Sequence, residues 1–354
     1  MAISEQAVLA ALTSVTDPRN VKNLRMQGGK VSFDVELGYP AQSQIPALRE
    51  ALIAAARSVP GVGEVSAQVS SKIIAHAVQR GVALLPGVKN IIAVGSGKGG
   101  VGKSATAVNL ALALAAEGAR VGLLDADIYG PSIPLMMGVQ GRPQSLDGQN
   151  MEPLLGHGVQ VMSIGLLVNA DDAMIWRGPM ASQALDQLLR QTRWKDLDYL
   201  VVDMPPGTGD IHLSLSQRVP ITGAVIVTTP QDIALADARK GVTMFEKVSV
   251  PILGLVENMA VHVCSHCGHA EHIFGADGGK RYAAEKGLDY LGALPLALPI
   301  REHTDAGRPT VVADPDGPLA ALYRDIARQV AIRVAAMGKD FSGKFPTIKI
   351  ERKT

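Results

Sequence analysis

Hydrophobic residues alternate with polar ones over much of the first 70 residues of the chain. Apolar side chains stand at every second position from Val31 to Leu37, which is typical of a strand with one buried face. Gly28 and Gly29 precede this run and predict the turn of a β-hairpin. The predicted elements are a helix at 4–14, the hairpin at 21–39, a helix at 46–59 and a strand at 65–69. The pattern therefore predicts a small α+β domain, of order α-β-β-α-β, over residues 1–75.

A different pattern begins near Asn90, where continuous runs of Val, Ile and Leu alternate with helical stretches. The runs cover residues 91–96, 121–127, 159–165, 199–205, 223–230, 252–259 and 290–296, and an amphipathic helix closes the series at 319–336. Such runs are typical of strands buried on both faces, so we expect an α/β domain with a mostly parallel sheet flanked by helices. We assign residues 91–340 to this domain, 76–90 to a packed linker and 341–354 to a flexible polar tail.

Composition narrows the range of partners. The chain has 354 residues, of which 47% are hydrophobic, and 34 Lys and Arg balance 33 Asp and Glu. A formal charge of +1 gives no attraction to nucleic acid or to anionic membranes, and 4% aromatic residues argue against base-stacking surfaces. The N-terminus lacks the pattern of a signal peptide, and no apolar run approaches ~20 residues. We therefore expect a cytoplasmic protein with no nucleic-acid and no membrane partner.

The chemistry is centred on a glycine-rich loop that follows the run at 91–94 and precedes a predicted helix. Its residues Gly97, Gly102, Lys103 and Ser104 fit the pattern G-x-x-x-x-G-K-[ST] of a phosphate-binding loop. Glycines let backbone N–H groups converge on phosphate oxygens at the start of a helix. Lys103 is expected on the β- and γ-phosphates and Ser104 on Mg²⁺. The predicted nucleotide-binding loop consists of Gly97, Gly99, Gly100, Val101, Gly102, Lys103 and Ser104.

Asp203 is the last residue of another predicted buried strand, and its carboxylate is the expected second anchor for magnesium. Two prolines and Gly207 follow, and the Gly207 amide is a candidate sensor of the γ-phosphate. The alternative is an ordinary proline turn capped by Asp210.

Asp125 and Asp127 end another predicted strand. Their spacing of two places both side chains on one face if the extended conformation continues through Asp127. We expect Asp125 to lie nearer the metal and Asp127 to orient the attacking water, because phosphoryl transfer depends mainly on positioning. The alternative for Asp127 is a helix or turn cap.

The segment KGGVGKS, from Lys98 to Ser104, is similar to the deviant Walker A loop of the MinD/ParA/nitrogenase-iron-protein class. This resemblance implies that Lys98 reaches the phosphates of a partner subunit in a nucleotide-sandwich homodimer. It also implies that Asn258 and Pro295 recognise adenine, which favours ATP as the nucleotide. A solvated loop lysine and an ordinary turn asparagine are the alternatives for Lys98 and Asn258.

The chain has two cysteines, Cys264 and Cys267, in a C-x-x-C motif just past the run at 252–259. Two thiolates at this spacing can hold one metal centre but cannot complete a four-thiolate site. A two-fold axis of a homodimer would supply four, which supports a bridging 4Fe-4S cluster. Zinc is an alternative because four histidines, His262, His266, His269 and His272, surround the motif. A redox dithiol and inert thiols are the others.

Five segments of the chain carry a second resemblance, and they are KGGVGKS, DADIYGPS, DMPPGTGD, ENM with the C-x-x-C motif, and LPLALPIRE. Together they resemble the Mrp/ApbC family of iron-sulfur cluster carrier ATPases over residues 85–340. The resemblance implies a homodimer that slowly hydrolyses ATP to ADP and phosphate and passes a 4Fe-4S cluster to apo iron-sulfur proteins, with cluster scaffold proteins as further partners. The first 70 residues resemble a small domain associated with iron-sulfur assembly, but they contain no cysteine, so we expect a docking or structural role. The alternatives are a positioning ATPase like MinD or ParA and a zinc-binding, nucleotide-dependent scaffold.

Overall fold

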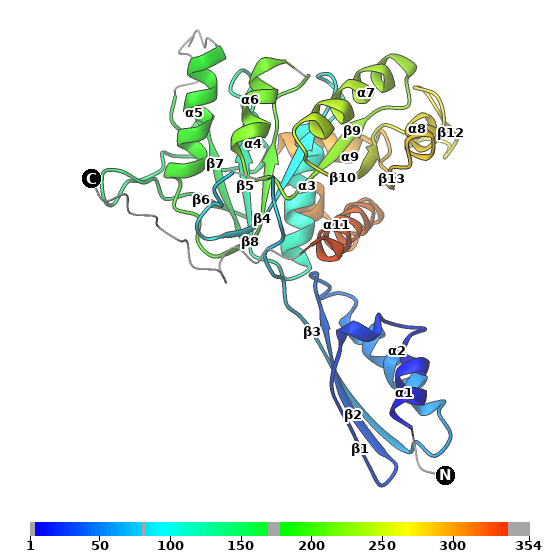
Figure 1. Cartoon of the computed structure of the whole chain (residues 1–354). Helices are drawn as coiled ribbons and strands as arrows, with labels where there is room; N and C mark the ends of the chain where they lie inside the picture. Colours follow the sequence, from blue (N-terminus) through cyan, green and yellow to red (C-terminus); the bar gives the residue numbers. More distant parts are fainter. Residues whose placement is uncertain (1–3, 80–81, 169–177, 208, 339–354) are drawn as a thin grey trace, which may run out of the picture.

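The computed structural model describes residues 4–79, 82–168, 178–207 and 209–338 and shows a small and a large domain (Figure 1). Thr208, residues 80–81 of the predicted linker and the predicted tail lie outside these ranges. Within them, no helix is long and apolar enough to cross a membrane.

The small domain is a three-stranded sheet with two helices on one face. Its elements are α1 (Glu5–Leu12), a 3₁₀ turn (Pro18–Asn20), β1 (Val21–Gln27), β2 (Lys30–Leu37), α2 (Ile45–Arg57) and β3 (Glu64–Ser71). β2 pairs antiparallel with β1 and parallel with β3. The alternate apolar side chains of β2, from Val31 to Leu37, are at most 2% exposed and pack with apolar residues of α1 and α2. The predicted order α-β-β-α-β is confirmed.

The large domain is built on one eight-stranded sheet of order β13-β10-β9-β4-β8-β5-β7-β6. Its strands are β4 (Val88–Gly95), β5 (Val121–Asp125), β6 (Leu154–Gly156), β7 (Val159–Ser163), β8 (Leu197–Asp203), β9 (Gly223–Thr228), β10 (Ile252–Glu257) and β13 (Tyr290–Ala293). Every neighbouring pair is parallel except β6 with β7. The predicted, mostly parallel sheet is therefore confirmed, with one antiparallel edge strand added.

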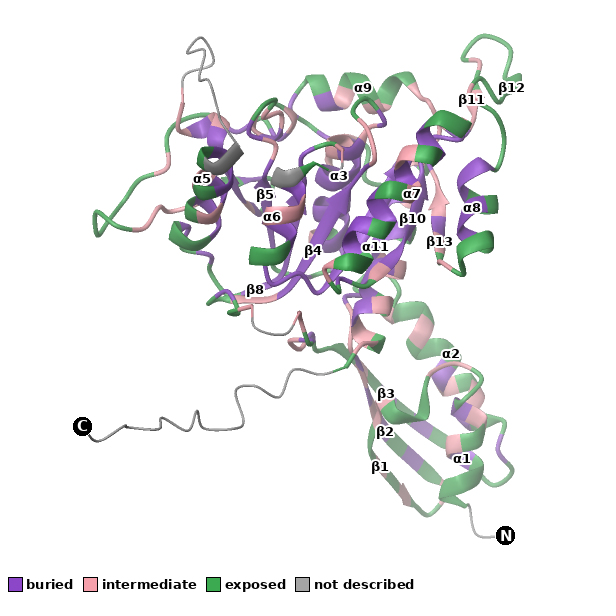
Figure 2. Ribbon diagram, turned by 45° about the horizontal axis from the view of Figure 1, so that its top comes forward, coloured by how far each residue is buried: buried purple, intermediate pink, exposed green. Residues whose placement is uncertain are grey.

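Helices cover both faces of this sheet and form two apolar cores, visible as buried positions in Figure 2. One face carries α3 (Lys103–Ala116), α4 (Ile133–Met136), α9 (Leu298–Asp305), α10 (Thr310–Ala313) and α11 (Pro318–Ala336). The other carries α5 (Gly178–Gln191), α6 (Asp210–Arg218), α7 (Asp232–Lys247) and α8 (Gly278–Lys286). Because both faces are covered, the strands need no polar side, which explains their continuous apolar runs.

The two domains meet at the end of the helix that starts at the phosphate loop. Glu117, just past α3, is 2% exposed, and its carboxylate accepts hydrogen bonds from the Ser43 amide (3.0 Å), the Ser43 hydroxyl (2.6 Å) and Arg328 of α11 (2.8 Å). The Glu117 carbonyl also accepts from the Gln42 amide. These hydrogen bonds of Gln42 and Ser43 to Glu117 hold the small domain against the large one.

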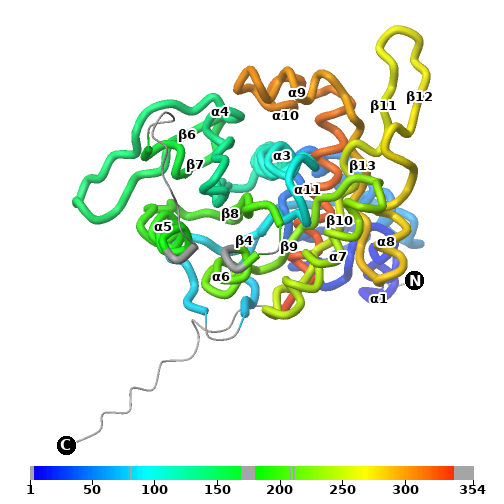
Figure 3. Tube along the Cα trace, turned by 90° about the horizontal axis from the view of Figure 1, so that it is seen from above, coloured from blue at the N-terminus to red at the C-terminus, as the bar shows by residue number. Residues whose placement is uncertain are grey.

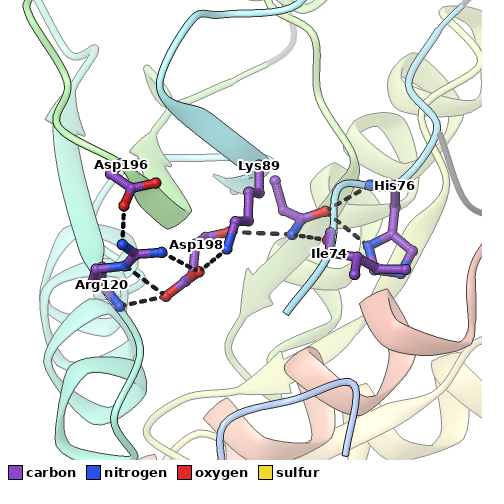
Figure 4. Close-up of polar contacts among 7 residues, drawn as sticks. Ile74, His76, Lys89, Arg120, Asp196 and Asp198 are labelled. Carbon is purple, nitrogen blue, oxygen red and sulfur yellow. Dashed lines mark hydrogen bonds and ion pairs between the residues drawn. The ribbon is translucent and has the colours of Figure 1, made fainter. Parts of the chain in front are cut away.

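The segment between the domains packs against the large domain by polar contacts (Figure 4). The buried Asn90 side chain binds the backbone of Ile74 and the backbone and ring of His76. Next to it, the Asp198 carboxylate accepts hydrogen bonds from Lys89 and Arg120. These contacts lie at the amino ends of the strands and leave the carboxyl ends free for a ligand.

Candidate functional site

The phosphate loop joins the centre of the sheet to the first residue of α3. Gly100 and Gly102 have φ of +80° and +81°, in the left-handed region that glycine adopts without strain. Gly97 has no room for a side chain, since a Cβ there would lie 2.1 Å from the carbonyl carbon of Asp237 in α7. The loop therefore has the strand-loop-helix geometry that its sequence pattern requires, with the helix N-terminus facing the loop.

A buried ion pair lies directly behind this loop. Lys103 Nζ is 2.5 Å from Asp203 Oδ1, and the two side chains are 6% and 0% exposed. Burial raises the pKa of Asp203 although Lys103 opposes the shift. Asp203 Oδ2 is buried without a hydrogen-bond partner among the described residues, and the Ser104 hydroxyl lies 3.3 Å from Lys103 Nζ. Ser104, Lys103 and Asp203 thus come together as predicted from the sequence, with one carboxylate oxygen still unsatisfied.

Asp125 lies beside Asp203 because the two residues are register partners on neighbouring parallel strands. Its carboxylate accepts hydrogen bonds from the amides of Asp127, Ser132 and Ile133 and from the Ser163 hydroxyl, all at 3.0–3.1 Å. Burial, with the neighbouring Asp203, raises the pKa of Asp125 to about 7. Asp125 therefore ties the following loop to the sheet, and Ser163, which the sequence pattern did not single out, completes this arrangement.

Asp127 does not continue the strand, which ends at Asp125. The condition for placing both carboxylates on one strand face is therefore not met, because the Asp127 amide turns back onto Asp125 Oδ1. The half-buried Asp127 carboxylate accepts a hydrogen bond from the Gly130 amide at 3.3 Å, as a turn cap does. It also lies close enough to Asp203 to raise the pKa of that carboxyl group, so it borders the same site.

The segment after β8 runs along the phosphate loop. Gly207 has φ of +89°, and its amide donates to the Ser96 carbonyl at 3.1 Å. The Ser96 hydroxyl in turn donates to the carbonyl of Lys98 at 2.9 Å. Gly207 and Lys98, both predicted from the sequence, therefore belong to one hydrogen-bonded unit, and the Lys98 side chain is half-buried at its edge.

Asn258 and Pro295 lie on neighbouring segments beside the phosphate loop. The Asn258 side-chain amide donates to the carbonyl of Val101 at 2.9 Å. Backbone hydrogen bonds join Ala260 to Leu294 and Val261 to Leu296, so the half-buried Pro295 lies across from the residues that follow Asn258. The arrangement brings the two predicted adenine contacts together at one end of the loop.

The two cysteines lie at the tip of a projecting hairpin formed by β11 (His262–Val263) and β12 (Ala270–Glu271), seen in Figures 2 and 3. The sequence did not predict this hairpin, because strands of two residues are too short to show a pattern. Both thiols are free, with Cys264 half-exposed and Cys267 exposed. Backbone N–H groups of Cys267 and His266 donate to the Cys264 sulfur and lower the pKa of that thiol.

Two of the nearby histidines are used in holding the hairpin base. His262 Nδ1 contacts the Leu296 carbonyl at 3.0 Å, and His272 Nδ1 contacts the Ala260 carbonyl at 2.7 Å. Over the described ranges, no group of three or more His, Cys, Asp or Glu side chains is placed to hold a metal ion. Within one chain, the hairpin therefore offers a pair of thiols on a fixed base.

Family models match both parts of the chain. The model described as "NUBPL iron-transfer P-loop NTPase" matches residues 87–331, and "Iron-sulfur cluster assembly protein" matches residues 5–69. An iron-sulfur cluster carrier protein of Escherichia coli (strain K12) is 61% identical over 259 residues, which cover 73% of this chain and 70% of that protein.

Solved structures agree with the fold. A nucleotide-binding protein of Archaeoglobus fulgidus in complex with ADP is 36% identical, covers 66% of this chain and 91% of its own, and has a TM-score of 0.58. The cell division ATPase MinD of Pyrococcus furiosus has a TM-score of 0.53 at 23% identity, over 68% of this chain and 98% of its own, and shares the fold. The chain therefore belongs to the NUBPL iron-transfer P-loop NTPase family and carries an iron-sulfur cluster assembly domain at its N-terminus.

Proposed function

We propose that this chain is an ATP-hydrolysing carrier that holds a 4Fe-4S cluster between two copies of itself and delivers it to apo iron-sulfur proteins. The names of its family and of its relative in Escherichia coli support the carrier role. Scaffold proteins that build clusters are the expected donors. The cluster is the cargo of this protein rather than a resident cofactor.

The observation that carries the proposal is the pair of thiols at the hairpin tip. Cys264 and Cys267 are accessible, and the amides of Cys267 and His266 favour the thiolate form of Cys264 that binds metal. A pair supplies half of the ligands that a 4Fe-4S cluster takes from cysteine. A second copy related by a two-fold axis would supply the other half.

The nucleotide site fits MgATP. The glycines of the loop would bind the phosphates, with Lys103 on the β- and γ-phosphates, and Asn258 and Pro295 would contact adenine. Ser104 and Asp203, whose Oδ2 lacks a partner among the described residues, would hold hydrated Mg²⁺. When bound, Mg²⁺ neutralises charge on the transferred phosphoryl group. In this proposal, Asp127 orients the attacking water from its place beside Asp203, Asp125 holds the loop that carries it, and Lys98 acts on the partner's phosphates.

The cluster is tested by anaerobic reconstitution, with iron, sulfide, zinc and the visible spectrum measured on the same sample. We expect one 4Fe-4S cluster per two chains in the wild type and loss of the cluster in Cys264→Ala and Cys267→Ala. Ser265→Ala, between the cysteines on the exposed tip, is the matched control and should retain it. A colourless protein that holds zinc through the same cysteines would support the zinc-binding scaffold instead.

The role of Lys98 across the dimer is tested by mixing two inactive variants. Lys98→Ala and Lys103→Ala should each hydrolyse ATP poorly alone. If Lys98 acts on the partner's nucleotide, a mixed dimer regains one complete site, with Lys103 from one subunit and Lys98 from the other. Recovered phosphate release on mixing supports this arrangement, whereas no recovery places both lysines in the same site.

The Asp127 assignment and the rival functions need separate measurements. Asp127→Ala should still bind ATP while phosphate release falls at least a hundredfold, as expected for loss of a water-positioning group; unchanged release would remove the assignment. Co-sedimentation with liposomes or DNA that depends on ATP would favour a positioning ATPase like MinD or ParA.

A further inference from the structure

One buried histidine contacts the segment beside the phosphate loop. His212, in the first turn of α6, is 2% exposed, and its Nδ1 lies 2.5 Å from the Gly207 carbonyl. The ring meets Phe245 of α7 edge to face, with centroids 5.3 Å apart and planes at 86°. Gly95, at the end of β4, leaves space for this pair, because a Cβ there would lie 2.9 Å from the Phe245 ring. His212 is therefore held in one orientation.

The protonation state of His212 follows from its surroundings. A carbonyl oxygen only accepts hydrogen bonds, so Nδ1 must carry the proton. Burial lowers the pKa of His212; the hydrogen bond to the Gly207 carbonyl opposes this shift, and the nearby Lys103 charge adds to it, so that the pKa stays below its ordinary value. The ring is therefore neutral at pH 7, with the proton on Nδ1. Its Nε2 is buried without a partner among the residues that the structure describes, so the contact with Gly207 is the ring's one hydrogen bond there.

Gly207 is held from two sides by these contacts. Its carbonyl accepts from His212, and its amide donates to Ser96, whose hydroxyl donates to the Lys98 carbonyl. Gly207, with a φ of +89°, is thus held on the carbonyl side of its Cα by His212 and on the amide side by Ser96. The Gly207 amide then faces the phosphate loop, where the Ser96 carbonyl is its present acceptor.

We propose that His212 is a positioning residue that holds Gly207 so that its amide can exchange the Ser96 carbonyl for an oxygen of the γ-phosphate. His212 thereby sets how well the site distinguishes ATP from ADP, which differ only in that phosphate. The inference rests on the proposed function, in which the Gly207 amide senses the γ-phosphate. His212 touches neither nucleotide nor metal and acts through Gly207 alone.

Two amide substitutions separate the donor from the shape of the ring. His212→Asn keeps an N–H near the position of Nδ1, whereas His212→Gln places its amide near Nε2 and leaves the Gly207 carbonyl without a donor. Ser216→Ala is the matched control, because the Ser216 hydroxyl binds the His212 carbonyl on the same helix and leaves the ring untouched. Affinities for ATPγS and ADP are measured for each protein by competition with a fluorescent nucleotide.

The expected result is a loss of about tenfold in the ratio of ATPγS to ADP affinity for His212→Gln, the upper range for one hydrogen bond. His212→Asn and Ser216→Ala should stay within about threefold of the wild type. Equal losses in His212→Gln and His212→Asn, or equal losses for both nucleotides, would overturn the inference. A wild type that binds ATPγS and ADP equally well would instead remove the proposed γ-phosphate sensing, whatever the variants do.

The wild-type protein gives a second test that needs no folded variant at position 212. With ¹⁵N-labelled histidine, NMR should show His212 as a neutral ring protonated at Nδ1, and ATPγS should shift this signal more than ADP does. A ring protonated at Nε2 at pH 7 would contradict the contact with Gly207, and equal shifts with both nucleotides would contradict the role in discrimination.

Discussion

Replacement of Lys103 by methionine should destabilise the large domain as well as abolish phosphate binding. Asp203 is 0% exposed and has Lys103 as its ion-pair partner at 2.5 Å. At an effective dielectric constant of about 20, charges at this distance attract each other by roughly 7 kcal/mol, part of which offsets the cost of burying them. Breaking such a pair leaves a buried charge, so we expect the free energy of unfolding to fall by about 3–5 kcal/mol in Lys103→Met.

The loss should depend on pH in a defined direction. Burial already raises the pKa of Asp203 above its ordinary value, and removal of Lys103 would raise it further. A carboxyl group with a higher pKa in the folded state binds more protons there than in the unfolded state, so stability falls as the pH rises through that range. The deficit of Lys103→Met relative to the wild type should therefore be largest near pH 8 and shrink toward pH 5.5.

Urea unfolding without nucleotide, followed by tryptophan fluorescence, measures this effect on the large domain, because Trp194 is buried in one of its two apolar cores. The control is a double-mutant cycle with Asp203→Asn. The double variant should be more stable than the sum of the two single losses implies, by about 2 kcal/mol. The reasoning would be refuted if Lys103→Met were as stable as the wild type, or if the losses of the two single variants simply added up in the double variant.

Three further predictions test separate features. Gly97→Ala should abolish nucleotide binding, because its Cβ would lie 2.1 Å from the Asp237 carbonyl carbon, whereas Gly130→Ala, with no atom within 4 Å of its Cβ, should bind normally in the same titration. Burial lowers the pKa of His212, so below about pH 6.5 the unfolded chain takes up a proton that the folded chain does not, and the free energy of unfolding decreases. Between pH 7.5 and pH 5.5, urea unfolding should therefore show a smaller loss of stability for His212→Asn than for the wild type. An equal loss in the two proteins would contradict this. Glu117→Ala should lower the free energy of unfolding by about 3 kcal/mol and speed tryptic cleavage between the domains, and an unchanged digest would show that Glu117 does not hold them together.

The sequence predicts the sheet and the phosphate loop well because each depends on a local pattern. Strands buried on both faces must be continuously apolar, and the loop at Gly97–Ser104 needs glycines at fixed spacing. The same holds for Asp203, whose place follows from the end of one apolar run.

The missed features leave no periodic pattern in the sequence. β6 has three residues and the strands of the cysteine hairpin have two, too few for a periodic signal. The turn after Asp125 arises because its carboxylate binds amides seven and eight residues later. His212 is a single histidine in a short helix, and only its burial against Gly95 and Phe245 distinguishes it.

The contact at Glu117 bears on how the two domains can be studied apart. Glu117 is 2% exposed, and Gln42 and Ser43 of the small domain contact it together with Arg328 of the large domain. A shortened protein that begins after the small domain would expose this acidic end of α3 to water, at the far end of the helix that starts at Lys103. If ATP turnover changed in such a truncation, the change could come from the loss of the contacts at the end of α3 or from the loss of the small domain itself. Point substitutions at Ser43 distinguish the two effects, because they remove a hydrogen bond to Glu117 and leave both domains present.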